Sequence, residues 1–246
     1  MTIGILIVDF VDLFEEWLPE TLKRLTIFED SNDSLAAELA NAQTNDPFHD
    51  FWLRNIETSR IVDPKVGAAS ASGSRNLEKF SVSYMVNAED FFQACLPTWT
   101  WQNLQVLSLT SQSLRYTGDR EKILALLCAA GAAALRMPKL RTLQIWNGTK
   151  GNACAFIYHW GKGGAGGAYI TWRGTWDLEL SPPLVEVWQR VALDSGASGL
   201  RVDKQRVEGI IGSHGEAIYR LDLPSRVVTP ASLWQIRREG AIILQE

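Results

Sequence analysis

The sequence predicts an α/β fold: an irregular leucine-rich-repeat-like solenoid with parallel strands and outer helices, closed by a C-terminal β-hairpin/α cap. One six-residue pattern, apolar-x-x-apolar-x-apolar, recurs at 22–27, 77–82, 104–109, 140–145 and 218–223. Helical patterns lie between the copies, and such alternation implies parallel strands with helices packed outside them. We therefore expect the first four copies to be neighbouring parallel strands in chain order.

The spacing of the copies is irregular, because they begin 55, 27, 36 and 78 residues apart. A regular leucine-rich repeat is about 20–29 residues long. The longest gap among the first four copies contains the low-complexity segment 67–74, which we expect to be an exposed, flexible loop. The prediction is one domain, 1–246, with a repeat part (1–150) and an atypical C-terminal part (151–246).

Apolar residues at helical spacing predict the outer helices. The predicted helices are one whose apolar stripe runs from Phe10 to Leu18, one over 33–42, one capped by Asn87, one over 119–136, and one that begins after Ser181 and buries Trp188. The helix over 119–136 has the widest apolar face, so we expect it on the outer face of the sheet.

Two strand-like segments, 153–160 and 168–176, are joined by the glycine-rich segment 161–167. This arrangement predicts a β-hairpin. The connection also matches G-x-G-x-x-G, but a dinucleotide site needs a helix directly after that motif. A strand is expected there instead, so no cofactor is predicted.

Composition and charge restrict the class of partner. The chain carries a formal net charge of −4, 46% of its residues are apolar, and it has no long basic run. These values argue against a nucleic-acid surface or an anionic membrane as the main partner. The apolar N-terminus lacks the features of a signal peptide, and no stretch approaches about 20 apolar residues. The predicted location is cytoplasmic or nuclear.

The residues that usually carry chemistry are isolated from one another. They are the cysteines Cys95, Cys128 and Cys154 and the histidines His49, His159 and His214. Zinc and dithiol sites need closely spaced ligands, which these cysteines do not provide. Buried free thiols in a reducing compartment are expected, and a single disulfide is the alternative. No catalytic or metal-binding residue is predicted, and His214 is expected at a helix end or in a loop.

Ten tryptophans are many for this length. Most are expected to pack in the core, but three lie at or near strand ends, namely Trp146, Trp172 and Trp176. Tryptophan is a favoured anchor in protein interfaces, so these three are the predicted partner-binding residues, which requires partial exposure. The alternative for the same three residues is packing in the core. Arg237 and Arg238 are expected on a solvated or salt-bridged face.

Four segments, 18–30, 101–111, 137–148 and 230–239, resemble in that order parts of a large fungal family of uncharacterised F-box-associated proteins. The resemblance implies a domain of unknown function that recognises protein partners and brings no catalytic residues. No F-box pattern is visible. The first strand pattern begins at Leu22, which leaves no room before it for a three-helix docking module. Ubiquitin-ligase components are therefore expected as partners only if a longer chain supplies an F-box.

The sequence thus predicts a protein-interaction domain that uses its concave strand surface and the adjacent strand-end loops. The alternative is an enzyme or small-molecule binder that uses residues 146–220, where Trp, His and Gly cluster. A structure separates the two classes, because a binder presents an open sheet and an enzyme presents a closed pocket with converging polar groups.

Overall fold

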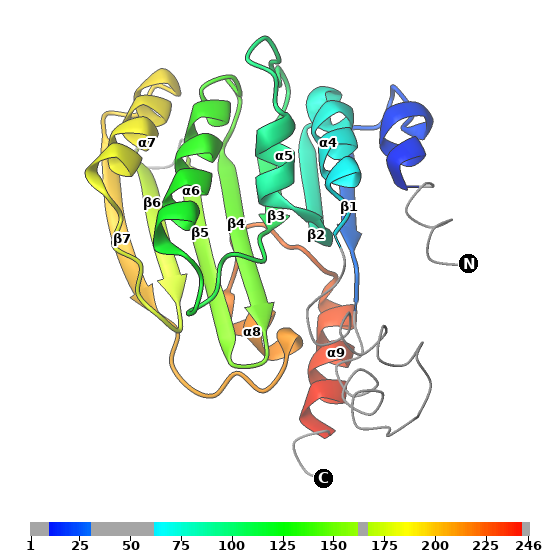
Figure 1. The fold of residues 1–246 in the computed structure, drawn as a ribbon, viewed down its shortest axis with the longest axis vertical. Coiled ribbons are helices and arrows are strands. Elements are labelled where there is room, and N and C mark those ends of the chain that lie inside the picture. Colours follow the sequence, from blue (N-terminus) through cyan, green and yellow to red (C-terminus); the bar gives the residue numbers. More distant parts are fainter. Residues whose placement is uncertain (1–9, 31–61, 162–166, 243–246) are drawn as a thin grey trace.

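The structure is a computed structural model that describes residues 10–30, 62–161 and 167–242. The predicted helix over 33–42, His49 and most of the glycine-rich connection lie outside these residues. A mixed α/β architecture is confirmed. Within the described residues, seven strands form one open sheet in the chain order β1-β2-β3-β4-β5-β6-β7 (Figure 1).

The sheet is mostly parallel. β1 to β4 pair in parallel, β5 is antiparallel to both β4 and β6, and β7 is parallel to β6. The first four predicted strands are therefore confirmed as parallel neighbours in chain order. The bounds are β1 Arg24–Phe28, β2 Lys79–Asn87, β3 Val106–Thr110, β4 Thr142–Thr149, β5 Asn152–Trp160, β6 Ala168–Gly174 and β7 Leu200–Arg206.

The repeated pattern also gives the register. Its fourth positions, Leu25, Phe80, Leu107 and Leu143, are aligned partners across β1 to β4. Leu107 is 1% exposed and Leu143 is fully buried, as expected for residues that face a helical layer. Copies of one pattern thus stack in the sheet and form one core.

Helices cover both faces of the sheet, though unequally (Figure 1). One face carries α4 to α7 and the larger core cluster, which includes Leu143 and Phe156. Trp146 and Ala155 alternate with these residues along β4 and β5, and they pack with α8 in a second cluster on the opposite face. The helices are η1 Leu13–Trp17, α4 Pro64–Gly73, η2 Ser74–Asn76, α5 Ala88–Ala94, α6 Arg120–Ala134, α7 Pro182–Asp194, α8 His214–Leu221 and α9 Pro230–Ile242.

The fifth copy of the pattern, 218–223, is not a strand. Its first four residues complete α8, in which Ile218 and Leu221 are buried. The spacing apolar-x-x-apolar is shared by the strand pattern and by one helical face, so it does not distinguish the two. His214 begins α8, in agreement with the expected helix-end position.

The prediction of an exposed, flexible loop at 67–74 is wrong, because this segment forms most of α4. Asp63 caps the helix by accepting a hydrogen bond from the Lys65 amide, and Pro64 occupies the first turn. Small residues let α4 approach α5 closely: a Cβ added to Gly67 would lie 2.5 Å from Asp90 Cβ. The low-complexity composition therefore reflects close helix packing.

The helix predicted over 119–136 is confirmed as α6, and Asp119 accepts hydrogen bonds from the first-turn amides. Trp188 is fully buried on α7, where its Nε1 donates to the Leu127 carbonyl. Trp17, in contrast, is 57% exposed, so the prediction that its helical stripe faces the core is wrong there. The stripe ends in the wider π-helical turn of η1, which shifts the positions of its residues around the axis.

The C-terminal hairpin is confirmed, because β5 and β6 pair antiparallel. Cys154 is the register partner of Gly174 at one end of the pairing, and Trp160 is the partner of Ala168 at the other. A strand follows the glycine-rich connection, so the helix that a dinucleotide site needs is not there. Within the described residues, no helix is long and apolar enough to cross a membrane.

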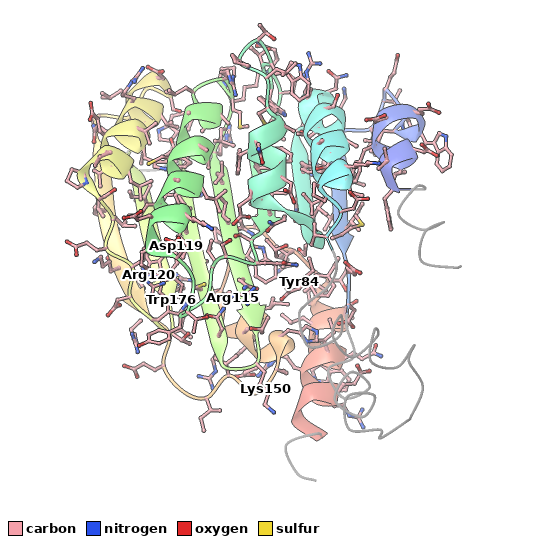
Figure 2. The ribbon with its side chains drawn as sticks, in the orientation of Figure 1. Tyr84, Arg115, Asp119, Arg120, Lys150 and Trp176 are labelled. Atoms are coloured by element: carbon pink, nitrogen blue, oxygen red, sulfur yellow. The ribbon has the colours of Figure 1, made fainter. Side chains whose placement is uncertain are left out.

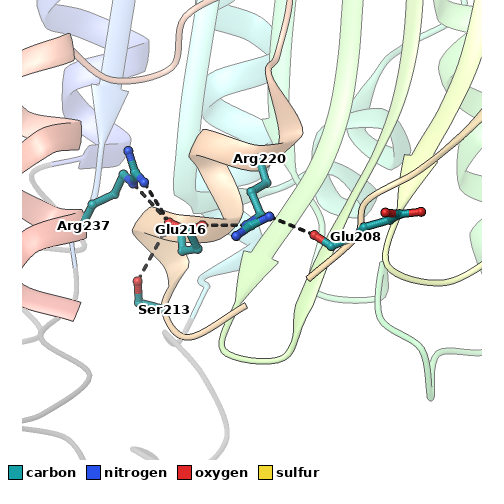
Figure 3. Close-up of polar contacts among 5 residues, drawn as sticks. All are labelled: Glu208, Ser213, Glu216, Arg220 and Arg237. Atoms are coloured by element: carbon teal, nitrogen blue, oxygen red, sulfur yellow. Dashed lines mark hydrogen bonds and ion pairs between the residues drawn. The ribbon is translucent and has the colours of Figure 1, made fainter. Parts of the chain in front are cut away.

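One carboxylate fastens the last two helices together (Figure 3). Glu216 on α8 accepts hydrogen bonds from Arg220 of the same helix and from Arg237 of α9. Arg220 also donates to the Glu208 carbonyl, which holds the loop before α8. The salt-bridged position expected for Arg237 is confirmed, and α9 is attached through α8.

Candidate functional site: the open strand face

The three tryptophans predicted as exposed anchors are buried. Trp146 is fully buried, and Trp172 and Trp176 are 1% and 3% exposed. Trp146 meets the ring of Tyr84 edge-on, with 5.2 Å between centroids, beneath α8. The expected exposure is therefore wrong, and these indoles cannot serve as surface anchors in this conformation.

Trp172 and Trp176 form a packed pair near the carboxyl end of β6. Their ring centroids are 4.7 Å apart, and Trp172 Nε1 donates to the Trp176 carbonyl. Trp176 Nε1 donates to Asn152, and the Arg120 guanidinium lies 4.0 Å above its ring (Figure 2). The strand end at which exposure was expected is covered by the start of α6.

The open surface lies on the face opposite α4 to α7, which we call the open strand face. One residue from each strand lies in a single row along it, defined by the register pairs. We call this set the register row; its members are Arg24, Lys79, Val106, Thr142, His159, Tyr169 and Arg201. The row crosses the whole sheet.

A segment of the chain, 222–229, sets one border of this surface. We call it the strap. Gln144 on β4 donates to the Ser225 carbonyl (2.9 Å) and accepts from the Ser225 amide (3.1 Å). Lys79 on β2 donates to the Arg226 carbonyl (3.0 Å). The strap thus runs from β4 toward β2, over the part of the next row in which Ser81, Ser108 and Gln144 are 0% exposed.

The register row is exposed at its ends, half-buried over most of its middle, and buried at Thr142, which is 6% exposed. Arg24 and Arg201 are exposed on the two edge strands, and the Arg24 side chain is 76% exposed. Lys79, His159 and Tyr169 are half-buried. A surface of this kind offers charged ends and a partly desolvated aromatic centre.

The middle of the row is held by local contacts. His159 Nδ1 lies 3.0 Å from Thr142 Oγ1, and its ring centroid lies 5.3 Å from that of Tyr169. Burial lowers the pKa of His159 from its ordinary value of 6.5, so the imidazole is neutral at pH 7. The centre of the row is therefore uncharged at neutral pH.

Two cations, Arg24 and Lys79, lie close together at the β1–β2 end of the row. Burial, with a smaller contribution from Arg24, lowers the pKa of Lys79. Glu78 lies 3.9 Å from Arg24, but this pair is largely exposed and contributes little. A negative group placed at this end would relieve the repulsion between the two cations.

The histidine gives a pH prediction. His159 is harder to protonate in the folded protein than in the unfolded one, so the unfolded state binds more protons below about pH 6.5 and stability falls there. His159→Gln, which keeps a polar group near Thr142, should make the loss of unfolding free energy between about pH 7 and 5 shallower. Urea titrations at three pH values measure it, and identical slopes for the variant and the wild type would contradict it.

The residues of the alternative function do not gather at one point. His159 lies in the register row. His214 lies at the start of α8, and its Nε2 is 2.8 Å from the Asp30 carboxylate. A groove of about 420 Å³ runs between β1, the strap and α9, and Asp30 is the titratable group among its described lining residues. No group of three potential metal ligands occurs in the described segments.

The cysteines are free thiols. Cys154 is buried, and Cys95 and Cys128 are half-buried. Burial raises the pKa of both Cys95 and Cys154 to about 12, so neither is a thiolate at neutral pH. These two residues therefore act as small apolar groups in packing.

Sequence reasoning missed the register row, although a signal was present. Arg24, Lys79, Val106 and Thr142 occupy the third position of the first four copies of the pattern. In a strand, residues adjacent to inward positions point to the other face. The third positions were thus identifiable as one stripe of that face.

A second exposed patch, on α8 and α9, was also missed. Tyr219 and Trp234 are 54% and 63% exposed. Arg237 lies 3.6 Å above the Tyr219 ring, and Arg238 lies 5.4 Å from the Trp234 ring. The spacing of Trp234 and Arg238, four residues apart on a helix, was the available signal.

Together these features define a mixed α/β protein with an open, mostly parallel sheet, one face of which is partly uncovered. Residues 17–229 match the family described as "Family of unknown function (DUF6546)", and the chain belongs to this family. Comparisons with curated proteins and with solved structures find no match. The match includes every strand of the register row and ends before α9 begins at Pro230.

Proposed function

We propose that this protein is a protein-interaction domain that binds its partner across the register row. The supporting observation is the row itself: a line of aligned side chains that crosses all seven strands and is at least partly exposed at every member except Thr142. Six strand spacings of about 4.8 Å make it about 29 Å long. A line of that length can hold an extended partner segment.

The chemistry of the row agrees with this role. Tyrosine and arginine are enriched at protein interfaces, and Tyr169, Arg24 and Arg201 belong to the row. The partly buried Tyr169 and His159 have already lost part of their conformational freedom, so less entropy is lost when a partner binds.

Two features support the finer interpretation of a leucine-rich-repeat-like arrangement. Strands β1 to β4 follow chain order in the sheet, and helices α4 to α7 lie on one face of it. In that architecture the strand face binds partners. In a longer chain with an F-box, the same face would present a client protein to a ubiquitin ligase.

Affinity capture tests the proposal with three baits: the wild type, Tyr169→Ala and Tyr116→Ala. Tyr116 is the matched control, because it is 72% exposed in the loop after β3, away from the row. Proteins captured by the wild type should be retained by Tyr116→Ala and reduced about tenfold by Tyr169→Ala, about 1.4 kcal/mol. Melting temperatures confirm that all baits are folded.

Equal capture by folded Tyr169→Ala and wild-type baits would overturn this function. Loss of capture with both tyrosine variants would also count against it, because it would show that the effect is not specific to the row.

A further inference from the structure

We infer that the partner segment is an extended peptide with acidic side chains at both ends and uncharged residues between them. This inference rests on the proposed function and names the partner's chemistry. It follows from where the charges of the open strand face lie.

The cations lie at the ends of the row. Arg24 and Lys79 lie on neighbouring strands at one end, and the exposed Arg226 of the strap follows Ser225 beside Lys79. Arg201 lies at the other end, on β7. None of the seven row residues is acidic, although the whole chain has a net charge of −4.

Two acidic side chains lie directly beside cations of the row. Glu78 pairs with Arg24 at 3.9 Å in an exposed position. Asp203, next to Arg201 on the same face, accepts a hydrogen bond from Gln205 (2.7 Å). The exposed Glu78–Arg24 pair is weak and gives way to a better-placed ligand. Asp203 keeps its negative charge beside Arg201, so the excess of positive charge is larger at the β1–β2 end of the row.

The middle of the row carries no charge at neutral pH. Val106 is apolar, Thr142 and Tyr169 are neutral, and the lowered pKa of His159 keeps its ring neutral. A carboxylate over this stretch would lose hydration without gaining a cation. Apolar or small polar partner residues fit better there.

The strand spacing gives the spacing of the partner's acidic groups. From β2 to β7 there are five strand spacings, about 24 Å. An extended chain covers about 3.3–3.6 Å per residue, so acidic groups about seven residues apart reach both ends. A nucleic acid would place a phosphate over every part of the row, including the uncharged centre, so a peptide is the better match.

The probe is a fluorescein-labelled nonapeptide with glutamate at positions 1, 2, 8 and 9 and neutral residues between. Three comparisons accompany it: the same composition with the glutamates in the middle, lysine in place of glutamate, and a nine-nucleotide oligothymidylate. Fluorescence anisotropy at low salt measures binding to the wild type, Arg24→Glu, Arg201→Glu and Lys150→Glu. Lys150 is the matched control, because it is exposed at the tip of the β4–β5 hairpin (Figure 2), about 25 Å along β4 from Thr142.

The end-acidic peptide should bind more tightly than each comparison, and its affinity should fall as salt is raised. Arg24→Glu and Arg201→Glu should each weaken it about tenfold, whereas Lys150→Glu should not. Equal binding of the middle-acidic peptide, tighter binding of the lysine peptide or of the oligothymidylate, or no effect of either arginine variant would overturn the inference. If Tyr169→Ala abolishes capture of a native partner while the end-acidic peptide does not bind, the proposed function stands and the acidic partner is excluded.

Discussion

Replacing Trp146 with alanine should lower the free energy of unfolding by about 3–5 kcal/mol, the range for a buried tryptophan. Its indole is 0% exposed and packs edge-on against Tyr84 in the cluster beneath α8. Deleting it would leave a large cavity between the sheet and that helix. Urea denaturation measures the loss.

Trp234→Ala is the control for this substitution. Trp234 is 63% exposed on α9, so its removal should change stability by less than about 0.5 kcal/mol. A loss of less than about 1 kcal/mol for Trp146→Ala would show that the indole is not part of the core in solution.

Leu143→Ala should cost about 2–5 kcal/mol, because Leu143 is fully buried and occupies the inward fourth position of the repeated pattern. Its neighbours in register, Leu107 and Tyr158, lie in the same core cluster and cannot all move to fill the space. Chemical denaturation measures this loss too.

Leu193 on α7 provides the comparison for Leu143, since it is a leucine that is 52% exposed. Leu193→Ala should change the free energy of unfolding only slightly. Equal effects of the two leucine substitutions would mean that the inward positions of the pattern do not form the core.

The parallel half of the sheet was predictable because its information is local. Each copy of the pattern contains its inward residues within six positions, and the intervening helices force parallel pairing. The same local signal failed at 218–223, because Ile218 and Leu221 satisfy a helix equally well. Helix and strand could not be separated there without the packing partners in β4 and β5.

The burial of Trp146 was not predictable from its own segment. It directly follows Ile145, the last inward position of its copy of the pattern, so it points to the opposite face. That face is covered at this point by α8, which lies about seventy residues later in the sequence. Local sequence gives the direction of a side chain in a strand but not what covers it.

The register row depends on long-range information for the same reason. Its half on β1 to β4 follows from the third positions of the pattern, whereas His159, Tyr169 and Arg201 join it only through the pairing of β4 to β7. The strap decides which row stays open, and Gln144 holds it through two hydrogen bonds to Ser225. No motif marks that contact.

Hydroxyl-radical footprinting with the bound end-acidic nonapeptide tests most directly that the open strand face is the binding surface. Oxidation of Tyr169 and His159, which are half-buried in the row, should fall when the peptide binds. Oxidation of Tyr219 and Trp234, the exposed aromatic residues of α8 and α9, should stay unchanged. Protection of Tyr219 and Trp234 without protection of the row would contradict the account and would place the binding surface on the C-terminal helices.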